Sequence, residues 1–224
     1  MKETSYTLRC LAHLLRYPDA SMVRHLHEIP QALDAEMALG AVRRAELDRL
    51  IRRLAADGMD AEAAYVDLFD RGRGTALHLF EHVHGDSRER GQAMVDLVKT
   101  YEQAGLYLAP GELPDHLTVL LEYASTQPAR SAREFLNEFA HILQAIAEAL
   151  RRRESDYVAV LAALLDLAGQ PLRPVNIADE PSLDESWNEP PAFDGCSSTG
   201  QARPGAPQPV QVIRRSPGNG APQR

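Results

Sequence analysis

Apolar side chains recur three and four positions apart along the first 170 residues of the chain. This spacing places them on one face of an α-helix, and the alternation of Val, Ile and Thr that is typical of strands is missing. The clearest windows are Met94, Leu97, Val98 and Tyr101; Leu117, Leu120, Leu121 and Ala124; Phe135, Phe139, Ile142, Ile146 and Leu150; and Tyr157, Leu161, Leu164, Leu165 and Ala168. The pattern predicts an all-α fold.

Proline and glycine interrupt this pattern where helices are expected to end, and they divide residues 1–170 into about eight or nine helices of a single compact domain. The interruptions are at 17–19, 29–30, 57–58, 71–74, 85–86, 109–111 and 127–128. Pro114 suits the first turn of a helix, with Asp115 near the positive end of the helix dipole. Ser131 and Glu134 predict a capping box at the start of another helix.

The composition changes from residue 171 onward, where ten of the 15 prolines lie. Such a segment cannot bury enough apolar surface to offset the entropy lost on ordering, so 171–224 is predicted to be a mobile, disordered C-terminal tail. Within it, residues 182–196 contain the only tryptophan, Trp187, in an acidic frame. We expect this piece to be a docking segment or to stay disordered.

The formal net charge of −8 argues against nucleic acid as a partner, because proteins that bind it normally have a basic surface. No apolar run approaches the roughly 20 residues that span a bilayer, and the N-terminus lacks the apolar core of a signal peptide. Cys10 and Cys196 have no cysteine near them in sequence, which is typical of a reducing compartment. We therefore expect a cytoplasmic protein without direct membrane insertion.

The turn DRGRG (70–74) resembles a phosphate-binding loop, since Arg71 and Arg73 alternate with Gly72 and Gly74. It lacks the third glycine and the preceding strand of the common nucleotide fingerprints. A helix end in which glycine supplies a positive φ is the favoured interpretation. Binding of a guanine nucleotide or a cofactor phosphate by residues 71–74 stays open as an alternative.

Two histidines, His78 and His82, are four residues apart, and a helix would place them on one face, where a pair of histidines can bind zinc. The HExxH spacing is absent, and Glu81 would lie off that face. A metal-dependent hydrolase that uses His78 and His82 is therefore a second alternative, although we favour a structural or surface role and predict no metal site.

Glu112, Asp115 and His116 form a polar cluster where a helix is expected to begin. An Asp–His pair resembles an acid–base dyad, but no Ser or Cys nucleophile lies in a recognisable turn nearby. We predict no catalytic residues and no enzymatic activity.

Two blocks of the sequence, 65–106 and 112–125, resemble the NarJ family of assembly chaperones for respiratory nitrate reductase. The motifs that carry the resemblance are FDRG (69–72) followed by LFEHVHG (79–85), and ELPDH (112–116). Segments 14–20, 151–157 and 187–196 also resemble that family. The likeness covers about residues 1–170 and touches the tail.

This resemblance implies a TorD-like, all-helical chaperone of the cytoplasm. Such proteins bind the N-terminal segment of the apo nitrate reductase catalytic (α) subunit. They keep it competent for insertion of the molybdenum bis-guanylate cofactor before it reaches its membrane anchor, and they are absent from the mature enzyme. No stably bound cofactor is implied, only a transient contact with the molybdenum cofactor of the client. The sequence leaves open the client isoenzyme and whether the chain forms a homodimer.

We expect the client peptide to contact polar and aromatic residues of the two blocks. They are Tyr65, Phe69, Asp70, Arg71, Phe80, Glu81, His82, His84, Glu112, Asp115, His116 and Tyr123. The predicted groove lies between the helices of 60–84 and a helix that starts at Pro114, with Asp115 and His116 on its rim. An acidic rim would attract a basic peptide, and a rim histidine would make binding depend on pH between roughly 5.5 and 8.

Overall fold

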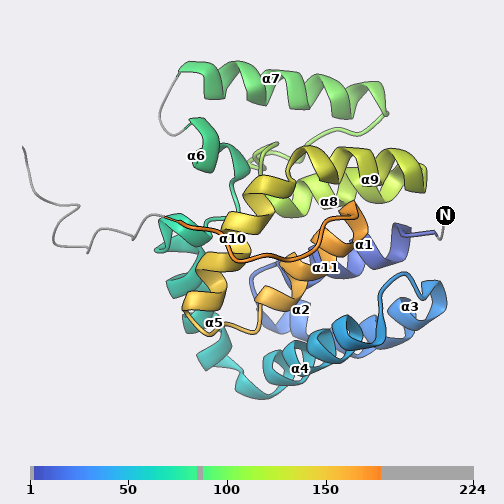
Figure 1. The fold of residues 1–224 in the computed structure, drawn as a ribbon, viewed down its shortest axis with the longest axis vertical. Helices are drawn as coiled ribbons and strands as arrows, with labels where there is room; N and C mark the ends of the chain where they lie inside the picture. The colour runs from blue at the N-terminus through green and yellow to red at the C-terminus, as the bar shows by residue number, and fades with distance from the viewer. Residues whose placement is uncertain (1–2, 85–87, 178–224) are drawn as a thin grey trace, which may run out of the picture. The chain divides into compact units, whose positions relative to one another are not determined.

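The computed structural model describes residues 3–84 and 88–177, which form a helical unit (Figure 1). The predicted all-α fold is confirmed for these residues, and the segment 182–196 lies outside them. The α-helices are α1 (Ser5–Leu14), α2 (Ala20–Arg24), α3 (Ile29–Glu36), α4 (Ala41–Asp57), α5 (Met59–Tyr65), α6 (Leu79–His84), α7 (Arg88–Gln103), α8 (Leu117–Thr126), α9 (Ala129–Glu138), α10 (Ala140–Arg152) and α11 (Val158–Ala168). Shorter turns are η1 (Leu26–Glu28), the π-helical η2 (Val66–Asp70) and η3 (Arg73–Thr75).

Several helix ends follow the local chemistry that the sequence predicts. The carboxylate of Asp19 accepts a hydrogen bond from the Met22 amide (2.7 Å) and so caps α2. Pro30 occupies the first turn of α3, where its missing N–H is not needed. Gly58 separates α4 from α5 with a φ of +49°, a conformation that glycine adopts readily.

Other helix boundaries differ from the prediction. Helix α8 begins at Leu117, so Pro114 and Asp115 belong to the turn that precedes it. Helix α9 begins at Ala129, directly after Pro128, and Ser131 therefore lies inside it and does not form the predicted capping box. The apolar window 135–150 is split between α9 and α10. As a result the helices are shorter and more numerous than the eight or nine expected.

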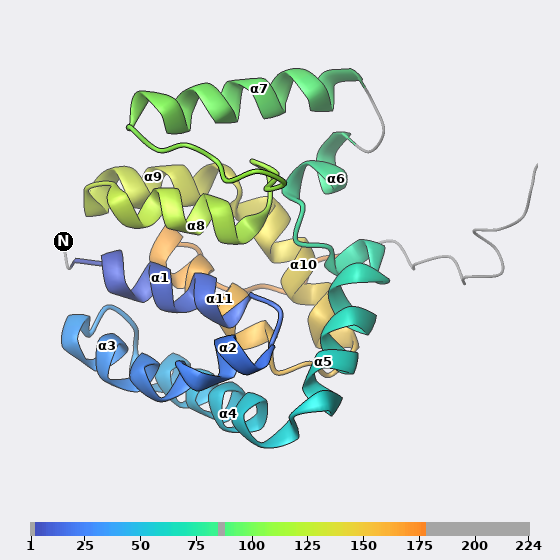
Figure 2. The same cartoon turned by 180° about the vertical axis from the view of Figure 1, so that it is seen from behind.

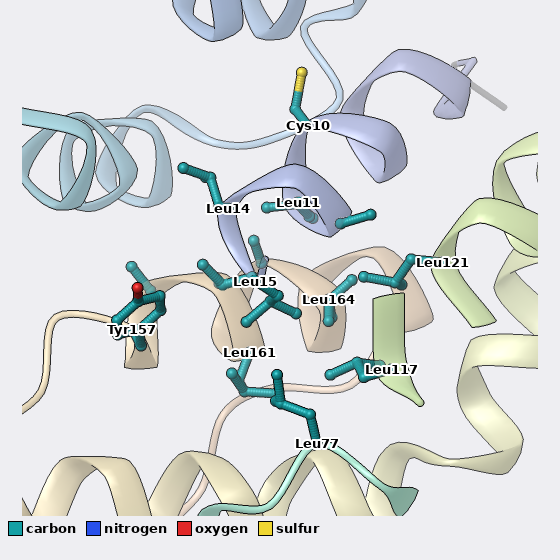
Figure 3. Packing of buried hydrophobic residues seen from close by; sticks show 14 of the residues in the cluster. Cys10, Leu11, Leu14, Leu15, Leu77, Leu117, Leu121, Tyr157, Leu161 and Leu164 are labelled. Atoms are coloured by element: carbon teal, nitrogen blue, oxygen red, sulfur yellow. The ribbon is translucent and has the colours of Figure 1, made fainter. Parts of the chain in front are cut away.

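Helix α11 is the centre of the main core. Residues Ala159 to Leu165 are all buried, as expected for a helix that is apolar on every side. It contacts α1, α4, α9 and α10. Figure 3 shows leucines of α1 and α8 converging on Leu161 and Leu164. Burying each such leucine stabilises the fold by about 1.5–3 kcal/mol.

A second, smaller cluster attaches α7, which lies at one edge of the unit in both views (Figures 1 and 2). Phe80 of α6 packs there with Leu97 and Tyr101 of α7. Tyr123 of α8 and Phe135 of α9 cover it from the other side. The loop that leads from α7 back to α8 passes along this cluster and becomes part of the candidate site.

Candidate functional site

Two connecting segments meet in front of α8. His78 and His116 pair as an isolated antiparallel β-bridge, in which the Leu117 amide donates to the carbonyl of Leu77 (2.8 Å). The bridge brings the two imidazole rings to a centroid distance of 4.9 Å. It thus joins two blocks that the sequence shows as separate motifs.

Asp115, the residue before His116 of this bridge, is completely buried. One carboxylate oxygen lies 3.3 Å from Nδ1 of His78, and the other lies 3.4 Å from a guanidinium nitrogen of Arg90. The same nitrogen of Arg90 lies 3.1 Å from Glu81. Asp115 therefore ties together α6, α7 and the start of α8, and it does not lie on the rim where we expected it. A buried charge needs such partners, because leaving it unpaired is costly.

These contacts shift the pKa values of His78 and His116 in opposite directions. The hydrogen bond to Asp115 raises the pKa of His78 against the opposing effect of burial. Burial, followed by the charge of His78, lowers the pKa of His116 to about 4. Burial pushes the pKa of Asp115 upward, but His78 and Arg90 outweigh it and hold this pKa below its usual value. His116 therefore titrates below the pH range in which we expected it to control binding.

A hollow of about 400 Å³ lies between α1, α8 and the α7–α8 loop, and we call it the α8 groove. Helices α1 and α8 pack side by side (Figure 2), and residues of both helices line the groove. Its lining residues are Arg9, Ala12, His13, Arg16, Tyr101, Leu106, Tyr107, Leu108, Glu112, Val119, Glu122, Tyr123, Ser125 and Thr126. An adjoining hollow of about 360 Å³ shares Glu112 and Val119 with it and reaches His78 and His116.

Side chains of arginine and of glutamate both line the α8 groove. Arg9, His13 and Arg16 line it on the α1 side, whereas Glu112 and Glu122 line it on the α8 side. We expected an acidic rim from the sequence, but the rim carries both acidic and basic side chains. An elongated ligand with one cationic and one anionic edge would fit only in one orientation.

Three tyrosines, Tyr101, Tyr107 and Tyr123, line part of the α8 groove. Tyr123 packs against Tyr101 (5.0 Å between centroids) and Phe135 (4.9 Å), and the hydroxyl of Tyr101 donates to the carbonyl of Pro114 (2.8 Å). Tyr107 is 80% exposed. Large exposed aromatic side chains are common energetic anchors at binding surfaces.

The predicted site residues are distributed over different environments. Glu112 and Tyr123 line the α8 groove, and His116 lines the adjoining hollow. Tyr65 and Phe69 are buried in the main core, and Phe80 is buried in the second cluster. Asp70, Arg71 and Glu81 are exposed, His82 is half-buried, and His84 is the last residue of α6.

The glycines of the turn at 70–74 were expected to supply a positive φ at a helix end, but the structure gives a different reason for them. Neither Gly72 nor Gly74 has a positive φ, and η3 is a single turn of three residues. Gly72 is required because a Cβ there would collide with the Thr75 hydroxyl and come within 2.5 Å of the Leu68 carbonyl. Close packing therefore explains this glycine without a phosphate.

The premise of the metal alternative is wrong, because His78 precedes α6 and does not share a helical face with His82. Nε2 of His82 lies 2.8 Å from the carbonyl of Ala76. In the described part of the chain, no three His, Cys, Asp or Glu side chains are placed to share a metal ion. Within the same residues, no helix has the length and apolarity to cross a membrane.

Sequence reasoning missed the contribution of α1 to the α8 groove. Arg9, His13 and Arg16 alternate with core positions and look like an ordinary solvated helix face. The apolar loop segment around Tyr107 carried the only signal, because Leu106 and Leu108 flank it between two glycines.

Comparison with known proteins supports the interpretation of the fold. A solved structure described as a candidate redox enzyme maturation protein from Archaeoglobus fulgidus matches with a TM-score of 0.52. It is 19% identical and covers 76% of this chain and 96% of its own, so it shows the fold alone. The fold class shared with that protein is thus all-helical.

The sequence comparisons are more specific. Residues 32–163 match the family model described as "Nitrate reductase delta subunit". The nitrate reductase molybdenum cofactor assembly chaperone NarJ of Escherichia coli (strain K12) is 43% identical over 82% of this chain and 78% of its own length. NarW of the same strain, named as a candidate for the same role, is 44% identical over 61% of this chain and 59% of its own. The chain belongs to the nitrate reductase delta subunit (NarJ) family. The expected family and the expectation of a non-enzymatic protein are confirmed by these relatives.

Proposed function

We propose that this protein is an assembly chaperone that binds the N-terminal segment of the apo nitrate reductase catalytic subunit in the α8 groove. It keeps the subunit competent for insertion of the molybdenum cofactor before membrane anchoring. The family relationship supports the chaperone role. The groove lined by both helices, with its apolar floor, is the single observation that supports the location.

The groove favours an amphipathic helix as ligand. Its apolar floor, with Leu106, Leu108 and Val119, would take one face of the helix, as in helix-in-groove recognition. The carboxylates of Glu112 and Glu122 would select cations on one edge of the peptide. The client peptide would therefore be held in one direction, with its basic edge toward α8.

Tyr107→Ala tests this location without disturbing the fold, since Tyr107 is exposed. We expect calorimetric titration with a synthetic peptide of the client N-terminus to give an affinity lowered on the order of tenfold, the usual effect of losing an aromatic anchor. Tyr6→Ala is the matched control, because Tyr6 is also exposed (59%) but does not line the groove. Equal affinities for wild type and Tyr107→Ala would refute the location.

The charge pattern has its own test. Glu122→Arg should weaken the peptide severalfold and more strongly at low salt, because rim charges act over distances that salt screens. Glu102→Arg, on the exposed face of α7, changes the net charge equally and should leave the affinity unchanged. The molybdenum cofactor is the client's cargo, and its transient contact with this chaperone stays a prediction, as do the cytoplasmic location and the oligomeric state.

A further inference from the structure

A separate hollow of about 500 Å³ lies between α4, α5, η2 and the α10–α11 turn, and we call it the α4–α5 pocket. It shares no lining residue with the α8 groove. Its apolar lining comes from Leu50, Leu54, Ala61, Ala64 and Leu68, and its polar lining comes from Arg53, Asp57, Asp60, Asp67, Arg153, Glu154, Ser155, Asp156 and Tyr157.

Tyr157 contributes a buried hydroxyl group that lacks a partner. The residue is 5% exposed, and its hydroxyl oxygen makes no hydrogen bond in the part of the chain that the structure describes. The ring is fixed by Phe69 (centroid distance 4.9 Å) and Tyr65 (6.2 Å). Most buried hydroxyls are satisfied, so an unpaired one that lines a pocket indicates a ligand atom that completes it.

The carboxylates around this hydroxyl outnumber the cations available to them. Arg53 forms ion pairs with Asp57 (3.3 Å) and Asp156 (3.2 Å). Asp60, Asp67 and Glu154 have no ion-pair partner among residues 3–84 and 88–177. The pocket is therefore negatively charged over an apolar base, and it complements a cation carried on an apolar stem.

We propose that the α4–α5 pocket binds an arginine side chain presented by an otherwise apolar segment of a partner polypeptide. The aliphatic part of the arginine lies on Leu54 and Leu68, and its planar guanidinium donates to the Tyr157 oxygen and to Asp60 or Asp67. Arginine suits the site because it presents several N–H donors at fixed angles. This binding goes beyond the proposed function, since it needs neither the α8 groove nor the client N-terminus.

The test measures, by fluorescence anisotropy, the affinity of the full chain for a short capped peptide of alternating leucine and arginine. The control peptide carries citrulline in place of arginine, which keeps the shape and removes the charge. We expect the arginine peptide to bind more tightly, on the order of tenfold, because charge-assisted hydrogen bonds are the stronger ones.

Tyr157→Phe is the decisive variant, because it removes only the unpaired hydroxyl. We expect this variant to keep the unfolding midpoint of the wild type and to bind the arginine peptide with severalfold lower affinity. The double variant Asp60→Asn with Asp67→Asn should weaken it further. Its charge-matched control is Glu3→Gln with Glu102→Gln, two exposed positions outside the pocket, and it should bind as the wild type does.

Three outcomes would overturn the proposal. Unchanged affinity in Tyr157→Phe and in the double variant would show that the pocket is not used. An equal loss in the charge-matched control would show that the peptide senses only the net charge. If the Tyr107→Ala variant no longer bound the arginine peptide, the peptide would bind in the α8 groove instead. Because that last variant tests the other site, failure of one proposal can be told apart from failure of the other.

Discussion

Replacing His116 by asparagine should change how the stability of the protein depends on pH. In the folded chain the pKa of His116 is about 4, because burial and the charge of His78 oppose its protonation. In the unfolded chain an imidazole titrates near 6.5. Between these values the unfolded state binds a proton that the folded state does not, so the wild type loses stability as the pH falls from about 6.5 towards 4.

The expected magnitude follows from the separation of the two pKa values. At pH 4.5 a histidine with these values costs the folded state about 2.5 kcal/mol relative to pH 7. His116→Asn lacks this proton linkage, and asparagine suits the N-cap position that His116 occupies in α8. The difference in unfolding free energy between wild type and variant should therefore shift by about 2.5 kcal/mol in favour of the variant between pH 7 and pH 4.5.

Urea denaturation followed by circular dichroism at the two pH values measures this shift. The subtraction removes the titrations of groups that do not interact with residue 116. His141→Asn is a matched control, because it makes the same substitution at a position exposed on α10. A shift below about 0.5 kcal/mol for His116→Asn, the level of surface substitutions, would refute the reasoning.

Two further substitutions test packing within the first of the two sequence blocks, residues 65–106. Gly72→Ala should lower the unfolding free energy by about 1–3 kcal/mol in urea denaturation, since the added methyl group would meet the Leu68 carbonyl at 2.5 Å, whereas Gly40→Ala has open space and should cost little. Tyr65→Phe should cost about 1 kcal/mol in the same assay, because the Tyr65 hydroxyl donates to the buried carbonyl of Leu15 (2.8 Å), and an unchanged midpoint would contradict this role.

The sequence predicted helices best where a single apolar stripe coincides with a single helix. The windows 94–101, 117–124 and 157–168 each lie within or next to one helix of the structure. The window 135–150 was misleading, because the same spacing of apolar residues continues through the break at Phe139. There the amide of Phe139 donates to Leu136 (3.2 Å) and closes α9, while the Phe139 carbonyl starts α10. The apolar periodicity carries no signal of this break.

The polar cluster at 112–116 was found from the sequence, but its geometry was not. Asp115 was expected on the rim of the groove because polar residues outside the apolar stripes cluster in the two blocks. Its burial depends on His78 and Arg90, which are 37 and 25 positions away along the chain. A single sequence does not show that such distant residues meet, so the division into a buried anchor and an exposed groove required the structure.

Helix α1 explains how one fold can keep its core while its binding surface changes. Leu8, Leu11 and Leu14 of α1 are buried in the core, whereas Arg9 lies on the opposite face of the helix and lines the α8 groove. The helical period separates Arg9 from these leucines, so a substitution at position 9 alters the charge that a ligand meets without removing buried apolar area. The acidic side of the groove has the same property, since Glu122 is exposed while its neighbours Leu120 and Leu121 are buried. Recognition of a particular client can therefore be tuned at the rims of the groove at little cost in stability.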